Sequence, residues 1–172
     1  MQGPRLTPTS YIVLGLLEWG GPCTPYELKA LVKLSVGNFW TLQHAQLYTE
    51  PARLAAAGYV TEEQEKAGRR RKLYEITDKG RAALADWRQA PTGELAELRD
   101  HGLLKLFFGA DAATLAPVQL EAHRAKLAEY EALRDQDAGD PPRSPWLALE
   151  AGIRAERSWI EYWEWVLKEA GP

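Results

Sequence analysis

Four consecutive cations lie between two strand-like segments, and this arrangement constrains the fold more than any other feature of the chain. Residues 59–65 can form one strand and residues 71–76 the return strand. Gly68 lies in the connection, where glycine can adopt the positive φ of a tight turn. The sequence therefore predicts a two-stranded ribbon that carries cations at or near its tip, namely Arg69, Arg70, Arg71 and Lys72.

This cationic tip suits contact with a nucleic-acid backbone. Three arginines can neutralise several phosphates, and each phosphate contact steepens the salt dependence of binding by roughly 0.9 in log-log slope. The alternative is a solvated charged turn with no partner. The elements before the ribbon favour the first interpretation.

Two helices with clear start signals begin the chain. Thr7 followed by Pro8 predicts an N-cap with proline at the first helical position, and this helix ends near Gly20. Thr24 and Glu27 form the pattern of a capping box, which predicts a second helix.

A third helix is predicted before the ribbon. Phe39 and Trp40 are expected to be large apolar anchors ahead of it, and Leu47 and Leu54 recur at helical spacing before a stop at Gly58. Pro51 removes one backbone N–H, so we expect a bent helix or one whose regular part starts nearer Thr49. Three helices followed by a two-stranded ribbon predict a winged helix-turn-helix, in which the ribbon is the wing.

Polar residues near the start of this third helix are the candidates for contact with base edges in the major groove. They are Gln43, His44, Gln46 and Thr49, to which Tyr48 adds a hydroxyl that can donate to a phosphate. An ordinary solvated helix face is the alternative for the glutamines, and surface packing of the ring is the alternative for Tyr48.

Six ordered motifs resemble the PadR family of bacterial transcriptional regulators. They are SYIVLGLL (10–17), GPCTPYEL (21–28), FW (39–40), QLY (46–48), RLAAAGYV (53–60) and YEITDKGRAAL (74–84). The segment LLKLFFG (103–109) resembles the opening of the helical C-terminal domain of longer members. The resemblance implies a homodimer that binds an inverted repeat in double-stranded DNA, usually as a repressor, and that a small molecule or another cue releases.

The resemblance also assigns roles to particular residues. It implies phosphate contacts for Tyr48 and for the wing cations Arg70 and Arg71. Two positions depart from the family pattern: Pro51 stands where many members have leucine, and Gln43 where many have serine. These departures weaken the transfer of contacts to the start of the third helix.

Charge divides the chain into two parts. The net charge is −3, but residues 1–90 hold 12 Lys and Arg against 9 Asp and Glu, a net +3, whereas residues 91–172 hold 9 against 15, a net −6. We therefore predict a DNA-binding domain over residues 1–90 and a helical dimerisation or effector domain over residues 91–172. The chain as a whole is predicted to be mainly α, with the small two-stranded wing. An acidic half should face away from a duplex.

The sequence shows no sign of catalysis, cofactor binding or membrane insertion. Its three histidines are far apart, without metal-ligand spacing, and no glycine-rich phosphate loop follows a strand. Cys23 is the single cysteine, which excludes an intramolecular disulfide. No secretory signal or membrane-length apolar run is present, so we expect a cytoplasmic protein that is not an enzyme and uses no metal or cofactor.

The last helix, predicted to start near Ser144, carries an unusually broad apolar stripe. It comprises Trp146, Leu149, Ile153, Trp159, Ile160, Tyr162, Trp163, Val166 and Leu167. A stripe wider than one neighbouring helix requires predicts a partner chain, so we expect a homodimer. The tryptophans could instead line a pocket for a small aromatic effector, or form core.

Shorter helices are expected over residues 77–87 and 103–108, and a longer one from Pro117 to about Arg134, followed by a loop over 135–145. A protein-protein adaptor built on the winged fold is the alternative function, since fold alone does not specify DNA binding.

Overall fold

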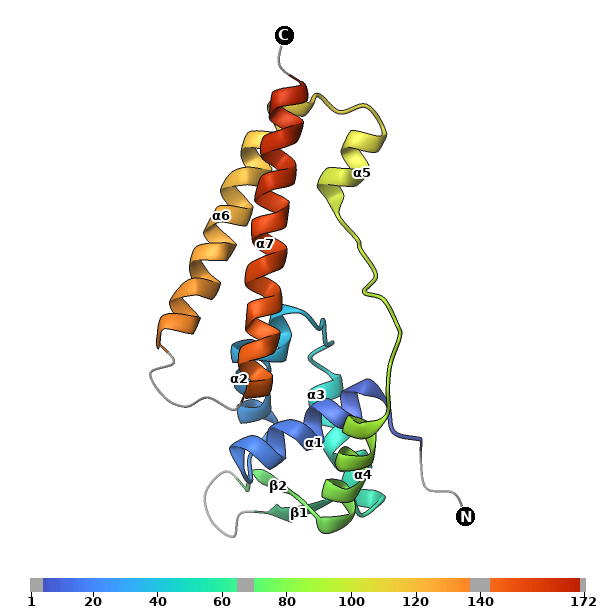
Figure 1. Cartoon of the computed structure of the whole chain (residues 1–172). Coiled ribbons are helices and arrows are strands. Elements are labelled where there is room, and N and C mark those ends of the chain that lie inside the picture. Colours follow the sequence, from blue (N-terminus) through green and yellow to red (C-terminus); the bar gives the residue numbers. More distant parts are fainter. Residues whose placement is uncertain (1–4, 65–69, 137–142, 171–172) are drawn as a thin grey trace. The chain divides into compact units, whose positions relative to one another are not determined.

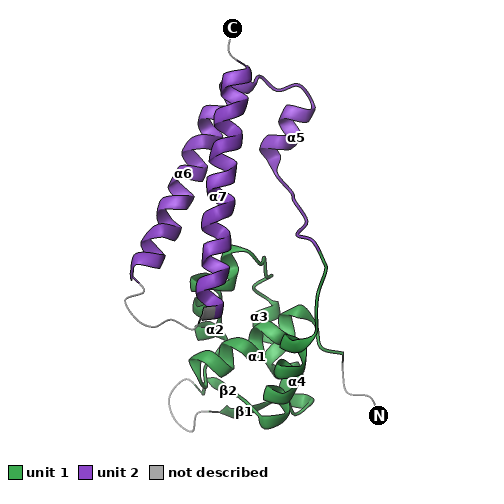
Figure 2. Ribbon diagram, in the orientation of Figure 1, with its two compact units in different colours: residues 1–94 green, residues 95–172 purple. Residues whose placement is uncertain are grey.

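The structure is a computed structural model that describes residues 5–64, 70–136 and 143–170. Arg69 and most of the predicted turn lie outside these residues. The chain divides into two compact units, Met1–Glu94 and Leu95–Pro172 (Figure 2). The elements are α1 (Pro8–Gly20), α2 (Pro25–Leu34), the 3₁₀ turn η1 (Val36–Asn38), α3 (Gln46–Ala56), β1 (Val60–Gln64), β2 (Lys72–Ile76), α4 (Asp78–Gln89), α5 (His101–Phe107), α6 (Ala112–Gln136) and α7 (Arg143–Glu169).

The helix starts in the first unit are fixed by the predicted side-chain caps. The Thr24 hydroxyl accepts from Glu27 N at 3.3 Å, and the Glu27 carboxylate accepts from Thr24 N at 2.8 Å. Thr7 caps α1 in the same reciprocal way with Ser10, and Thr77 caps α4. Mainly α structure with a small wing confirms the predicted fold class.

Helix α1 is the centre of the first unit. It packs against α2, α3, α4 and β2 (Figure 1). Its Val13, Leu14 and Leu17 are at most 1% exposed in a core that the other elements complete. This core fixes the position of α3 and of the wing base, and both carry predicted DNA contacts.

A close backbone approach joins α4 to the segment between α3 and β1. Gly80, in the first turn of α4, lies so near Tyr59 that a Cβ there would come within 2.2 Å of the Tyr59 carbonyl oxygen. Thr77 N donates to the same carbonyl at 3.1 Å. Glycine is thus required at position 80 by packing, since its φ is not in the left-handed region.

Of the two alternatives predicted for the third helix, a bend or a later start, the later start is wrong. The helix begins at Gln46 rather than near Thr49, and Pro51 lies inside it with its ring buried. The missing N–H at Pro51 costs one hydrogen bond, to the carbonyl of Leu47, close to the helix start. Burial of the ring in the core offsets part of that cost.

Gln43 and His44 were predicted within this helix, but they precede it. Gln46 N and Leu47 N donate to the carbonyls of Gln43 and His44, which is a tight i to i−3 turn. Leu42 and Leu47 both pack on the core. Positions five apart lie on different faces of an α-helix, so the chain must leave helical geometry between them.

The prediction that Phe39 and Trp40 are apolar anchors is also wrong. Phe39 is 67% exposed and Trp40 is 44% exposed. Val32, Leu42 and Leu47 contribute to the core at this point, and the two larger rings do not.

The second unit contains α5, α6 and α7, of which α6 and α7 pack along each other. Trp163 and Ile153 of α7 are fully buried. Helix α6 starts at Ala112 rather than at Pro117, because the Asp111 carboxylate accepts hydrogen bonds from Ala113 N and Thr114 N. No helix among the described residues is long and apolar enough to cross a membrane.

Candidate nucleic-acid interface

The exposed surface of α3 carries the predicted base-contacting residues that are helical. Gln46, Tyr48 and Thr49 are exposed, whereas Leu47 between them is 1% exposed. The Thr49 hydroxyl donates to the carbonyl of Ala45 at 3.2 Å, so its lone pairs remain available as acceptors. Ala45, which precedes the helix, and Ala56, its last residue, are exposed as well.

Gln43 and His44 are exposed in the turn just before α3. They therefore lie beside the helix start rather than on its face. The structure places all five predicted residues on or next to the first turn of α3.

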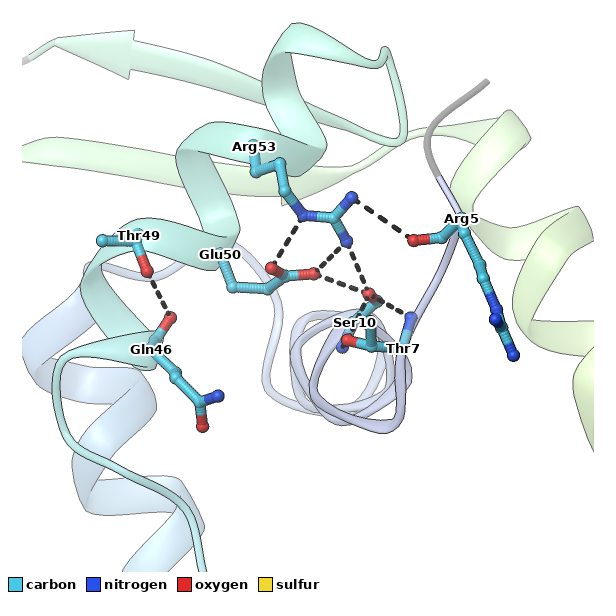
Figure 3. A network of polar contacts seen from close by, with 7 residues as sticks. All are labelled: Arg5, Thr7, Ser10, Gln46, Thr49, Glu50 and Arg53. Carbon is cyan, nitrogen blue, oxygen red and sulfur yellow. Dashed lines mark hydrogen bonds and ion pairs between the residues drawn. The ribbon is translucent and has the colours of Figure 1, made fainter. Parts of the chain in front are cut away.

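A polar network that sequence reasoning missed fixes α3 against α1 (Figure 3). Arg53 donates from Nε to Glu50 Oε2 at 2.9 Å and from Nη2 to Glu50 Oε1 at 2.6 Å. The Ser10 hydroxyl of α1 donates to Glu50 Oε1 at 2.6 Å and accepts from Arg53 Nη2 at 2.9 Å. Ser10 is fully buried, so this network joins the two helices at a desolvated point.

The network keeps its charges over a wide pH range. Hydrogen bonds from Arg53 hold the pKa of Glu50 below its ordinary value, although burial acts in the opposite direction. A further contact runs from Arg53 Nη1 to the carbonyl of Arg5. The signal in the sequence was the i,i+3 spacing of Glu50 and Arg53, but the buried Ser10 partner is 43 positions away from Arg53.

The wing is a regular antiparallel pair. Val60 is opposite Ile76 and Gln64 is opposite Lys72. Tyr74 of β2 also exchanges two backbone hydrogen bonds with Cys23, each 3.0 Å long, which ties the wing to the segment before α2. The base of the wing is therefore fixed to the helical core.

The predicted wing cations have different surroundings. Arg70 is exposed with a left-handed φ of 49°, and its carbonyl accepts from Gln64 Nε2 at 3.2 Å. Arg71 is exposed as well. Lys72 instead pairs with Glu62 across the two strands, with 2.7 Å between Nζ and Oε1.

The Glu62 carboxylate also accepts a hydrogen bond from the Tyr74 hydroxyl at 2.8 Å. The contacts from Lys72 and Tyr74 lower the pKa of Glu62, and burial raises the pKa of Tyr74 to about 12. The positive charge of Lys72 is therefore partly neutralised by the carboxylate of Glu62.

The predicted residues of α7 do not form one site within a single chain. Trp146 lies 17 positions before Trp163, which is about 25 Å along a helix. Ile153, Trp163 and Val166 are at most 7% exposed, with Trp163 and Val166 in a core cluster that includes residues of α6. Leu149, Trp159, Ile160 and Tyr162 are half-buried, whereas Trp146 and Leu167 are exposed.

Comparisons with known proteins cover both units. The family described as transcriptional regulator PadR-like matches residues 13–86, and the one described as virulence activator alpha C-term matches residues 98–170. The chain is similar to the negative transcriptional regulator PadR of Bacillus subtilis, at 29% identity over 91% of this chain and 94% of that protein. It is also similar to the probable transcriptional regulator Rv1176c of Mycobacterium tuberculosis, at 31% identity over 80% of this chain and 84% of that protein.

Solved structures show the same similarity. The crystal structure of Bacillus subtilis PadR in complex with operator DNA matches with a TM-score of 0.83 at 26% identity, covering 94% of this chain and 98% of that chain. The crystal structure of that protein in complex with p-coumaric acid matches with a TM-score of 0.79 at 25% identity, covering 94% and 97%.

Proposed function

Because the chain belongs to the PadR-like family of transcriptional regulators, we propose that this DNA-binding regulator represses transcription by binding an inverted-repeat operator as a homodimer. The observation that carries the proposal is the exposed polar face at the start of α3. Hydrogen bonds from the buried Ser10 of α1 to Glu50 and Arg53 attach this helix to the core. Similarity to a protein solved with operator DNA supports DNA binding over an adaptor role.

In this proposal α3 enters the major groove. Gln46 and Thr49 contact base edges, and Tyr48 donates to a phosphate. Gln43 and His44, in the preceding turn, contact the groove edge or the backbone next to it. The wing contacts the adjacent phosphates through Arg70 and Arg71, and Arg69 and Lys72 add positive charge to the same ribbon.

Exposed apolar side chains of the second unit support dimerisation. Phe107 and Phe108 of the α5 end are 83% and 77% exposed, and Trp165 of α7 is 56% exposed. Phe107 and Phe108 are also in edge-to-face contact, with ring centroids 5.2 Å apart, and adjacent exposed apolar side chains are typical of interfaces. Sedimentation equilibrium at micromolar concentration should give twice the chain mass of 19.3 kDa, and a monomer mass at every concentration would refute the dimer.

We also propose that a small aromatic acid releases the protein from DNA. The solved complex of Bacillus subtilis PadR with p-coumaric acid supports this class of effector. The half-buried rings of α7, among them Trp159, support a pocket for it in the second unit, although Trp163 is fully enclosed in the core.

Fluorescence anisotropy with labelled duplexes tests DNA binding. The DNA immediately upstream of the protein's own gene is compared with random duplex at two salt concentrations. Arg70→Ala should weaken binding to both duplexes alike, whereas Gln46→Ala should weaken the specific duplex preferentially by about tenfold, since one good base contact is worth about 1–3 kcal/mol. Arg154→Ala on α7 is the matched control and should change neither.

Equal effects of the Arg70 and Gln46 variants on the two duplexes would refute this division of roles. Weak binding of the wild-type protein to every duplex at low salt would instead favour the adaptor alternative.

A further inference from the structure

The start of α2 lies beside the second strand of the wing. Tyr74 N donates to the Cys23 carbonyl and Cys23 N donates to the Tyr74 carbonyl, each at 3.0 Å, in an antiparallel bridge. In an antiparallel pair, the residues that follow one partner run alongside those that precede the other. This arrangement brings the first turn of α2, which contains Glu27, towards the end of the wing that carries Arg71.

Glu27 is an exposed carboxylate that is held in place by the helix cap. Its Oε2 accepts from Thr24 N and from the Thr24 hydroxyl, both at 2.8 Å. These two bonds lower the pKa of Glu27, and the positive charge of Arg71 lowers it further. Glu27 is therefore negatively charged at neutral pH, and it is near enough to Arg71 for the two charges to attract each other.

The negative charge of Glu27 is not needed for capping. A glutamine completes a capping box with threonine as well as a glutamate does. A carboxylate beside a surface that binds DNA is also repelled by the phosphates. The attraction of Arg71 does require the charge, because a neutral side chain at position 27 would not draw the guanidinium towards it.

The guanidinium of an arginine can bind two acidic partners at once. It has five N–H donors in a planar fork, so one edge can face a carboxylate while the other donors face a phosphate. An exposed arginine that moves freely loses rotamer freedom when it binds, and this loss weakens the complex. A carboxylate that holds the side chain beforehand removes part of the loss.

We propose that Glu27 is a positioning residue for DNA binding, which holds the Arg71 guanidinium so that its remaining N–H groups meet a phosphate. The proposal rests on the proposed function, because it assigns a task to a residue beside the wing of that DNA-binding regulator. Glu62 has the opposite effect on Lys72, which it contacts at 2.7 Å between Oε1 and Nζ. The ammonium of lysine is a compact charge without a planar fork, so this pairing competes with a phosphate.

NMR of the DNA-free full chain tests the pair itself. Relaxation of the side-chain Nε–Hε signal of Arg71 reports how ordered the guanidinium is. We expect this signal to be more ordered in the wild type than in Glu27→Gln. The melting temperature should stay unchanged, because glutamine also completes the capping box. Equal order of the Arg71 signal in the two proteins would overturn the proposal.

Fluorescence anisotropy with the upstream and the random duplex tests the role in DNA binding. Glu27→Gln should weaken binding to both duplexes by about threefold, the factor expected when one long side chain must be ordered on binding. In the Arg71→Ala background the same change should cause no further loss, since the side chain that Glu27 holds is gone. Arg71→Lys should keep the salt dependence of the wild type but not its affinity, because lysine lacks the planar fork.

Glu75→Gln is the matched control. Glu75 is exposed near the other end of β2, and its replacement changes the net charge by the same amount. A general loss of repulsion from DNA would raise the affinity of both glutamine variants. Stronger binding by Glu27→Gln than by the wild type, or an equal loss in the Arg71→Ala background, would therefore overturn the proposal.

The two experiments separate this proposal from the proposed function. A wild-type protein that binds neither duplex refutes the proposed function and with it the task of Glu27, while the NMR comparison still shows whether the pair forms. A wild-type protein that binds DNA and is unaffected by Glu27→Gln keeps the proposed function and refutes only the positioning role.

Discussion

Replacement of Arg53 by methionine should destabilise the first unit by about 2 kcal/mol. The guanidinium donates two hydrogen bonds to Glu50 and one to Ser10. Loss of one partner from a fully buried ion pair costs about 3–5 kcal/mol, whereas an exposed pair is worth at most about 1 kcal/mol. The Arg53 and Glu50 side chains are 35% and 12% exposed, which places this pair between the two limits.

Arg88→Met is the matched control for this prediction. Arg88 pairs with Glu18 of α1 at 2.5 Å between Nη2 and Oε2, so both arginines link α1 to another helix. The Arg88 and Glu18 side chains are 51% and 29% exposed, and the loss should stay below about 1 kcal/mol. Native-state hydrogen exchange of α1 and α3 amides measures both changes within the first unit.

A double variant sharpens the test. In Arg53→Met/Glu50→Leu no carboxylate is left without its partner, so part of the lost stability should return. Equal losses from Arg53→Met and Arg88→Met, or a double variant less stable than Arg53→Met alone, would refute the burial argument.

The same network predicts a pH dependence. The pKa of Glu50 is lower in the folded protein than its unfolded value of about 4.3. The unfolded chain therefore binds the proton first, so the contribution of Glu50 is complete above about pH 5 and is lost as pH falls through its folded pKa. Glu50→Gln should flatten this part of the stability curve measured by hydrogen exchange or urea unfolding.

Three further predictions concern single sites. Gly80→Ala should cost more than about 3 kcal/mol or prevent folding, because the new Cβ meets backbone; Gly93→Ala, with open space around it, is the control in thermal unfolding. Glu62→Gln should raise duplex affinity and steepen the salt dependence by up to about 0.9, because Lys72 loses its intramolecular partner; unchanged salt slopes in anisotropy would count against this. Burial raises the pKa of Cys23 to about 11, so at pH 8 a disulfide reagent should react with the unfolded chain at least tenfold faster than with the native one.

Local signals predicted the capped starts of α1, α2 and α4 and the two strands of the wing. The Thr7, Thr24 and Thr77 caps act between residues three apart, so the information they need lies within one turn of chain. The strands were likewise indicated by a contiguous segment and a turn. Ion pairing of Lys72 with Glu62 was missed, because it depends on the strand register that places them diagonally across the ribbon.

The sequence by itself determined the order of helices and strands, the winged arrangement and the separation of charge between the two halves, because caps, periodicity and composition are local properties. Tertiary structure decided what these residues face. It moved Gln43 and His44 out of α3 because Leu42 and Leu47 both reach the core, and it left Trp40 exposed instead of in that core. Such outcomes depend on which distant side chains fill the same volume, since a close-packed interior admits one set of neighbours and excludes the rest.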